Sequence, residues 1–187
     1  MLTLTALYPP QVTRAGGSYL HTAASATRDC TLAVYGAQLQ AALQSGKCSQ
    51  VLRASYISGD GTIMGTIGVA DLISAAAAQK AGQVTGAQEI GSPAAAAAQP
   101  ASQVSGGQNV IAPLASSTGP TRKLGSGTGI ERAEIKGHYL ILMWAEYANL
   151  KSPSGQAQRQ ALEQFAANLV TGSANINLST RMLSGKQ

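Results

Sequence analysis

Residues 139–147 read Tyr-Leu-Ile-Leu-Met-Trp-Ala-Glu-Tyr and form the most apolar stretch of this 187-residue chain. In an extended strand, successive side chains point to opposite faces, so the odd-numbered positions share one face and Leu140, Leu142 and Trp144 share the other. Both faces are apolar. A strand of this kind is central in its sheet and is covered on both sides.

The face that carries Trp144 needs its own covering layer, because we expect the helices of this chain to cover only the other face. Two segments are candidates for this layer: the long insertion at residues 84–128, and a second protein. We favour a partner. Leu140, Leu142 and Trp144 are therefore the candidate interface, and the sequence predicts a protein partner or a homo-oligomer.

Two predicted hairpins organise the chain around this strand. The first joins residues 50–58 to residues 62–69 through Gly59-Asp60-Gly61, where Asp-Gly tolerates the positive φ of a tight turn. The second joins residues 129–136 to residues 138–147. Each hairpin is followed by a helical pattern, so the sequence predicts an α+β fold: an antiparallel sheet of four or more strands from two ββα repeats, with the helices packed on one face.

Three helical patterns accompany the hairpins. Leu32, Tyr35, Leu39 and Leu43 recur at helical spacing before the hairpins begin. A short Ala-rich helix is predicted after the first hairpin. The best-marked helix has Ser152 as its N-cap and Pro153 at its first position. Its expected buried stripe consists of Leu162, Phe165, Ala166 and Leu169.

The chain divides into an irregular N-terminal arm at residues 1–28 and a single α+β domain at residues 29–187. Residues 84–128 interrupt this domain as a low-complexity insertion with no aromatic residue and one acidic residue, Glu89. Such a composition buries too little apolar surface to fold independently. Ile111, Leu114 and Leu124 are the side chains that we expect to attach it to the domain.

Charge is sparse and scattered. Charged residues make up 11% of the chain, and the net charge is +5, whereas soluble domains average about 25% charged residues. The basic residues form no cluster with interleaved aromatics, so nucleic acid is not an expected partner. A weak attraction to an anionic cell-wall polymer is compatible with this charge. The low charge favours an extracellular or cell-envelope location. Since residues 1–5 lack the pattern of a signal peptide, we expect any signal or anchor to lie upstream of Met1.

The two cysteines, Cys30 and Cys48, favour a disulfide if the protein is exported. An unbroken helix over residues 31–45 would be about 21 Å long, and a disulfide needs Cα atoms within about 7 Å. Two alternatives follow. Either the helix begins near Gly36 and residues 30–35 fold back along it, or both thiols are free.

Several of these segments together resemble a known kind of protein. They are Asp29-Cys30, Gly46-Lys47-Cys48, Arg53-Ala54-Ser55-Tyr56 with Gly59-Asp60-Gly61, and residues 137–144. In this combination the chain resembles uncharacterised secreted or membrane-anchored ectodomains of high-GC Gram-positive (actinobacterial) bacteria, over residues 29–85 and 128–183. The resemblance implies an extracellular setting. It implies no activity and no functional residue.

Few residues suggest chemistry. His138 at the start of the apolar strand could serve as a general acid or base, but Glu146 lies about 26 Å along the strand. Arg53 and Arg132 hold equivalent positions in the two repeats and are candidates to bind an anionic ligand. With eight acidic residues, the chain offers little for a metal site or paired-carboxylate catalysis. We therefore expect no cofactor and no catalytic residue.

The sequence favours a non-enzymatic extracytoplasmic binding or assembly module that acts through a sheet face, with self-association as one route. The alternatives are a small secreted hydrolase that uses His138, and a structural protein of a virion or surface appendage.

Overall fold

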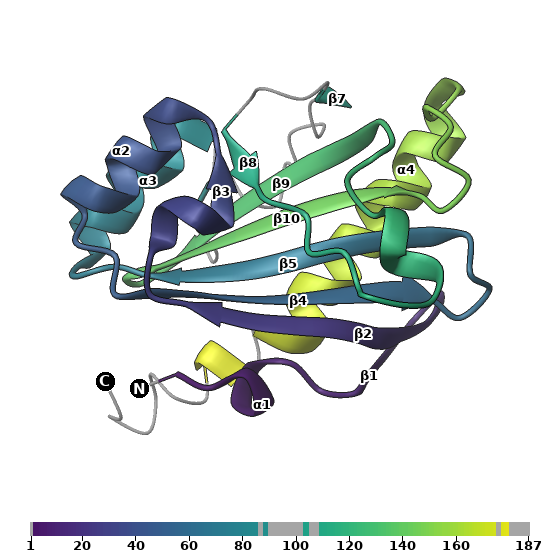
Figure 1. Ribbon diagram of the computed structural model, residues 1–187, viewed down its shortest axis with the longest axis horizontal. Helices are drawn as coiled ribbons and strands as arrows, with labels where there is room; N and C mark the ends of the chain where they lie inside the picture. The colour runs from purple at the N-terminus through teal and green to yellow at the C-terminus, as the bar shows by residue number, and fades with distance from the viewer. Residues whose placement is uncertain (1, 86–87, 90–102, 105–108, 175–176, 180–187) are drawn as a thin grey trace.

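The computed structural model describes residues 2–85, 88–89, 103–104, 109–174 and 177–179. The fold is α+β, as predicted, and its main feature is an antiparallel sheet with the strand order β1-β2-β4-β5-β10-β9 (Figure 1). The long strands are β1 Gln11–Arg14, β2 Gly17–Thr27, β4 Gln50–Ser58, β5 Ile63–Asp71, β9 Gly129–Lys136 and β10 Tyr139–Tyr147. Short strands β6 Gln88–Glu89 and β7 Gln103–Val104 pair with β9. A separate two-stranded sheet joins β3 Val34–Tyr35 to β8 Val110–Ile111.

Both predicted hairpins are present, as β4–β5 and β9–β10. Strand β10 is central, because it pairs with β9 on one side and with β5 on the other, from Tyr139 opposite Asp71 to Tyr147 opposite Ile63. Its side chains are buried on both faces from Tyr139 to Glu146. The position predicted for the most apolar segment is therefore confirmed.

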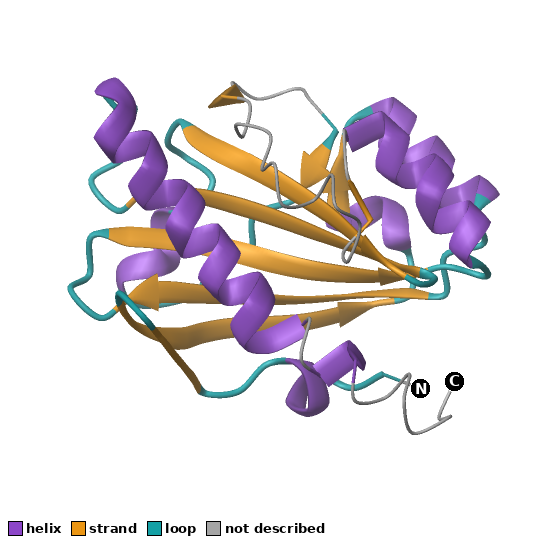
Figure 2. Ribbon diagram, turned by 180° about the vertical axis from the view of Figure 1, so that it is seen from behind, coloured by secondary structure: helices purple, strands orange, loops and turns teal. Residues whose placement is uncertain are grey.

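Helices cover both faces of the sheet, so the prediction that they pack on one face is wrong. The helices are α1 Leu4–Leu7, η1 Cys30–Ala33, α2 Ala37–Ser45, α3 Ala75–Thr85, η3 Pro120–Lys123, α4 Gly155–Leu169 and η4 Val170–Ala174. Helices α2 and α3 pack with Leu140, Leu142 and Trp144 on what we call the front face. Helices α1 and α4 pack on the back face, where α4 crosses the strands (Figure 2).

The opposite placement of α3 and α4 also means that the two strand–strand–helix units are not equivalent in three dimensions. Only Leu72–Ser74 separate β5 from α3, whereas residues 148–154 separate β10 from α4. Helix α3 presents the small side chains of Ala78 and Ala81 to the front core, whereas α4 buries the predicted stripe that includes Leu162 and Phe165 in the back core. Helical periodicity identified the apolar side of α4, but not the side of the sheet to which it would pack. The helical pattern over Leu32, Tyr35, Leu39 and Leu43 was wrong in its first half, because Leu32 and Tyr35 precede α2 and are exposed.

Residues 1–28 are not an irregular arm as predicted. Residues 11–14 and 17–27 form β1 and β2, and β2 pairs with β4 from Tyr19 opposite Ser58 to Thr27 opposite Val51. A β-bulge interrupts this pairing between His21 and Ala23. The N-terminal segment also contributes to the back core, where the Tyr8 hydroxyl donates to the Leu52 carbonyl at 2.7 Å.

Two glycines of β5 allow the layers on both faces to approach the sheet closely. A Cβ at Gly65 would lie 2.4 Å from the carbonyl oxygen of Trp144 and 2.7 Å from Cε1 of Phe165 on the back face. A Cβ at Gly68 would lie 2.5 Å from Cδ1 of Ile111 on the front face. Gly65 requires glycine because its closest neighbour is a backbone atom, whereas a side chain at Gly68 would displace the end of Ile111.

We predict that Gly65→Ala lowers the free energy of unfolding by about 2–3 kcal/mol, because the new methyl group would overlap a backbone carbonyl in a close-packed core. Urea unfolding measures this change. Ala41→Leu is the control, since it enlarges a side chain at an exposed position of α2. Equal stability of Gly65→Ala and the parent protein would contradict the close packing over β5.

Candidate functional site

The predicted interface residues are not accessible to a partner. Leu140, Leu142 and Trp144 are all buried within the chain, and Trp144 is only 5% exposed. Besides α2 and α3, residues 109–125 cover them, and we call this segment the strap. The strap contributes Val110, Ile111 and Leu124 to the front core. The sequence left two candidates for the layer over Trp144, the insertion and a second protein. Residues 109–125 of the insertion provide it, so the preference for a partner at this face was wrong.

The strap runs from β8 across the front of the sheet (Figure 1), and side chains of the sheet hold its backbone in place. Arg53 Nη1 donates to the Ala112 carbonyl at 2.9 Å. Two residues later, the Leu114 N–H donates to Thr66 Oγ1 at 2.9 Å, and Ser55 Oγ donates to the Leu114 carbonyl at 2.7 Å. Ser55 and Thr66 are fully buried. The hydroxyl groups of Ser55 and Thr66 therefore form the hydrogen bonds to the strap backbone that a neighbouring strand would otherwise form.

A buried carboxylate fixes the end of the strap. Glu146 is fully buried, and its Oε1 accepts a hydrogen bond from the Gly125 N–H at 2.9 Å while its Oε2 accepts one from Trp144 Nε1 at 2.9 Å. The N–H groups of Ser126 and Gly127 also bind this carboxylate. Burial raises the pKa of Glu146, although all four donors act to lower it. Three successive N–H groups of the strap end, those of Gly125, Ser126 and Gly127, thus bind one carboxyl group of the same chain.

Arg53 and Arg132 do not form a joint anion site. Arg53 pairs with Gly68 on β4–β5 and lies on the front face beneath the strap, where burial lowers its pKa. Arg132 is opposite Met143, on the back face, and its Nε is 2.6 Å from Glu134 Oε1. The sheet separates the two guanidinium groups, so one ligand cannot contact both.

Cys30 and Cys48 form a disulfide with a Cα–Cα distance of 6.3 Å. Helix α2 begins only at Ala37, and residues 30–35 form η1 and β3 before it. The chain folds back as the first of the two predicted alternatives requires. The disulfide fits an extracellular location.

His138 lies at the opposite end of β10 from Glu146. Its Nε2 is 3.5 Å from Asp71 Oδ1, and its ring is 3.9 Å from that of Tyr139, measured between centroids. Neither cysteine can act as a nucleophile for His138, because both are in the disulfide. His138 is thus placed as a partly exposed side chain that pairs with Asp71 at the end of the sheet.

Strand β2 is longer than β1, and no described strand pairs with the outer edge of the part that extends past β1. β1 pairs with β2 only from Gly17 to Leu20, and one further backbone bond joins the His21 N–H to the Pro10 carbonyl. From Ala23 to Thr27, β2 pairs with β4 on its inner side, and from Thr22 to Thr27 it pairs with no described strand on its outer side. These six residues are Thr-Ala-Ala-Ser-Ala-Thr, without charge or proline. Beyond the β-bulge at its start, this edge lacks the charged residues and prolines that prevent strand pairing. We call it the β2 edge.

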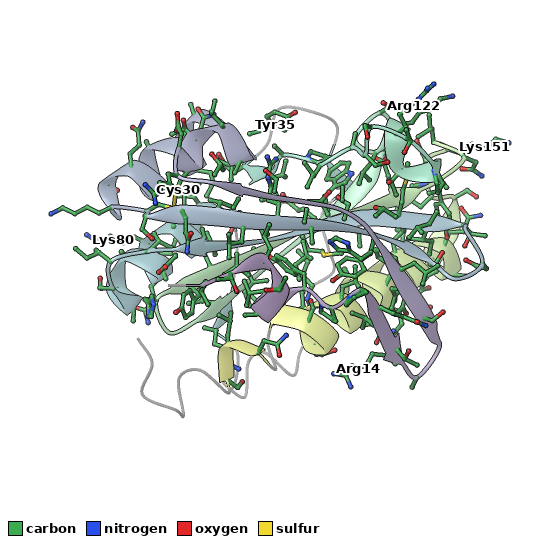
Figure 3. All side chains as sticks on the ribbon, turned by 60° about the horizontal axis from the view of Figure 1, so that its bottom comes forward. Arg14, Cys30, Tyr35, Lys80, Arg122 and Lys151 are labelled. Carbon is green, nitrogen blue, oxygen red and sulfur yellow. A yellow bond between two sulfur atoms is a disulfide. The ribbon has the colours of Figure 1, made fainter. Side chains whose placement is uncertain are left out.

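Exposed apolar side chains gather beside the β2 edge. Four large apolar side chains are exposed among the described residues: Leu20, Leu32, Tyr35 and Ile73. Three of them belong to β2 or to the segment directly after it. Leu32 on η1 is 69% exposed, and η1 contacts β2. Tyr35 on β3 is 53% exposed and lies at the surface of the molecule (Figure 3). The β2 edge and these two side chains form the candidate interface of the folded chain.

This surface was missed in the sequence for a physical reason. Alanine and serine have weak strand propensity, and residues 22–27 show no alternation between large apolar and polar side chains. The signal that was available is the absence of charge over the whole segment from Gly16 to Thr27 apart from His21.

Comparison with known proteins finds no matching family model, no matching curated protein and no matching solved structure. Among the described residues, no group of three or more His, Cys, Asp or Glu side chains is arranged to hold a metal ion. No helix in this part of the chain has the length and apolar character needed to cross a membrane. The functional argument therefore depends on the surfaces of this chain alone.

We predict that Thr66→Val loosens the strap, because it preserves the shape of residue 66 but leaves the Leu114 N–H without its acceptor. The expected loss in the free energy of unfolding is about 1–3 kcal/mol. Trypsin should also cleave faster after the exposed Arg122 and Lys123. Thr13→Val, the same change at an exposed position of β1, is the control. Equal stability and equal cleavage of the two variants would contradict this role of Thr66.

A second prediction concerns Glu131, which lies opposite Trp144 on β9. Burial raises the pKa of Glu131 to about 7. The folded state therefore retains a proton that the unfolded state has lost, and this group favours folding increasingly as the pH falls from about 8 to about 5. Glu131→Gln should remove this dependence and stabilise the protein at pH 8 by on the order of 1 kcal/mol, after allowance for partial solvent screening.

Urea unfolding of the parent protein and Glu131→Gln between pH 5 and pH 8 measures this difference. Other titrating groups cancel in the comparison. A constant difference across this pH range would show that Glu131 keeps an ordinary pKa.

Proposed function

We propose that the protein is a non-enzymatic extracytoplasmic assembly module that binds a second copy of itself through the β2 edge. The observation that carries this proposal is the uncharged outer edge from Thr22 to Thr27, with which no described strand pairs. Unpaired backbone N–H and C=O groups along an edge strand are a template for another strand. The binding surface is an edge of the sheet, in place of the buried face that the sequence suggested.

A second copy is a suitable occupant because the β2 edge is compatible with itself. Two antiparallel β2 strands are related by a two-fold axis perpendicular to the sheet, near Ala24 or Ser25. In either register the opposing side chains are alanine, serine or threonine, with no like charges facing each other. Since each chain has a net charge of +5, an uncharged contact region limits the repulsion between copies.

The exposed apolar side chains support the same arrangement. A two-fold axis perpendicular to the sheet leaves the front faces of both copies on the same side. Leu32 and Tyr35 of each copy then flank the junction on that side. The burial of their apolar surface would lower the free energy of the dimer. Leu32 and Tyr35 have no other evident reason to be exposed.

The extracytoplasmic setting is supported by the disulfide and by the low content of charged residues. The hydrolase alternative has no comparable support. His138 has a carboxylate neighbour in Asp71, but both sulfur atoms are oxidised. Neither cysteine can therefore act as the nucleophile that the hydrolase alternative needs.

We predict that the protein dimerises reversibly and that Ala24→Lys weakens the dimer by about tenfold or more, because two ammonium groups then meet on the back face close to the axis. Sedimentation velocity over a concentration series measures this. Ala24 is exposed, so the monomer fold should be unaffected. Ala41→Lys adds the same charge on the exposed side of α2 and is the matched control.

Two results would contradict the proposal. One is a parent protein that remains monomeric at high concentration. The other is a dimer that Ala24→Lys and Ala41→Lys leave equally stable, since this would place the contact elsewhere.

A further inference from the structure

An open groove lies at the other end of β2 from Thr22–Thr27. It has a volume of about 480 Å³ and is lined by residues 16–19 at the β1–β2 turn, residues 58–63 at the β4–β5 turn, and Ala161, Gln164 and Phe165 of α4. Small-molecule sites typically have volumes of about 300–1,000 Å³. The groove is therefore large enough for a ligand of a few sugar rings.

The walls of the groove are fixed by contacts between the two turns. The Gly59 N–H donates to the Ser18 carbonyl at 2.8 Å. A Cβ at Gly59 would lie 2.7 Å from Ser18 Oγ, so glycine is needed for this approach. Asp60 closes its own turn by accepting hydrogen bonds from Ser58 Oγ at 2.6 Å and from the Thr62 N–H at 3.0 Å. The groove thus requires little ordering when a ligand binds, which favours affinity.

The floor of the groove is apolar and well packed. Tyr19 and Phe165 meet edge to face, with ring centroids 5.2 Å apart, and Ile63 lies beside them. All three side chains are buried, so only their outer atoms reach the groove. The floor therefore offers a small apolar contact for the C–H groups of a ligand ring.

The groove also contains spare hydrogen-bonding groups of both kinds. The hydroxyl of the buried Tyr19 accepts from Asn168 Nδ2 at 2.6 Å, but its own proton has no acceptor among the described residues. In the same part of the chain, no hydrogen bond uses the Ser18 hydroxyl. Gln164 donates through Nε2 to Asn168 at 2.9 Å, which leaves its Oε1 free to accept. Donors and acceptors therefore lie close together around the floor.

We infer that this groove binds a neutral oligosaccharide of two or three rings. A sugar hydroxyl both donates and accepts hydrogen bonds, which matches the mixture of Tyr19, Ser18 and Gln164. Asp60 is the only charged side chain of the lining, so an anionic sugar or a phosphate is disfavoured. The strand residues of the lining, Gly17–Tyr19, Ser58 and Ile63, are already paired with neighbouring strands. An extended peptide would therefore find no free strand edge among them.

The test is a titration of isotope-labelled protein with chitotriose, cellotriose and maltotriose, followed by amide chemical shifts. The expected result is saturable binding of at least one trisaccharide, with shifts confined to residues 16–19, 58–63 and 161–165. An anionic trisaccharide of galacturonic acid should bind more weakly.

Variants separate the groove from the rest of α4. Ala161→Trp fills the groove and should weaken binding by about tenfold or more, whereas Gln160→Trp adds the same ring at the neighbouring exposed position and should leave binding unchanged. Tyr19→Phe removes the spare donor and should weaken binding by about fivefold. The inference is overturned if none of the three neutral trisaccharides binds saturably, or if Ala161→Trp binds as well as Gln160→Trp. The Ala24→Lys variant should bind sugar normally, so the outcome is independent of self-association.

Discussion

The burial of both faces of β10 is the constraint on which the rest of the structure depends. Tyr139 to Glu146 have no exposed side, so two separate layers must cover the central strand. Helix α4 provides the layer on the back face. On the front face α2 and α3 reach only part of the strand, and the strap completes the cover over Trp144. The insertion is therefore a structural part of the domain where it crosses the sheet.

The strap is held by polar groups as well as by apolar burial. Ile111 packs over Gly68. Ser55, Thr66 and Glu146 form hydrogen bonds with the strap backbone at Leu114 and Gly125 from inside the sheet. Buried polar groups are costly unless every partner is present. This arrangement fixes the position of the strap, since a small shift would leave several buried groups without hydrogen bonds. It also removes Trp144 from the surface, so any partner must use another part of the molecule.

The sequence predicted the elements with strong local patterns and missed those that depend on distant contacts. The two hairpins and the buried stripe of α4 follow from alternation and helical spacing. The fold-back before α2 was one of two alternatives that the reach of the chain left open, and the disulfide between Cys30 and Cys48 decides for it. No local pattern indicates that Thr66 binds the backbone of Leu114, which is 48 residues away. Strand β2 was missed because residues 22–27, its second half, all have small side chains. The candidate interface was wrong because the apolar pattern of β10 predicts burial, but it does not identify the covering segment.

The central claim is that one chain covers the front face of β10 by itself, and the environment of its single tryptophan tests this most directly. The fluorescence of Trp144 should be measured at dilutions where the protein is monomeric, together with quenching by acrylamide. The account predicts a blue-shifted emission and weak quenching, both unchanged from high to low concentration. A red-shifted emission with strong quenching in the monomer would contradict it, because Trp144 would then need a partner to be buried.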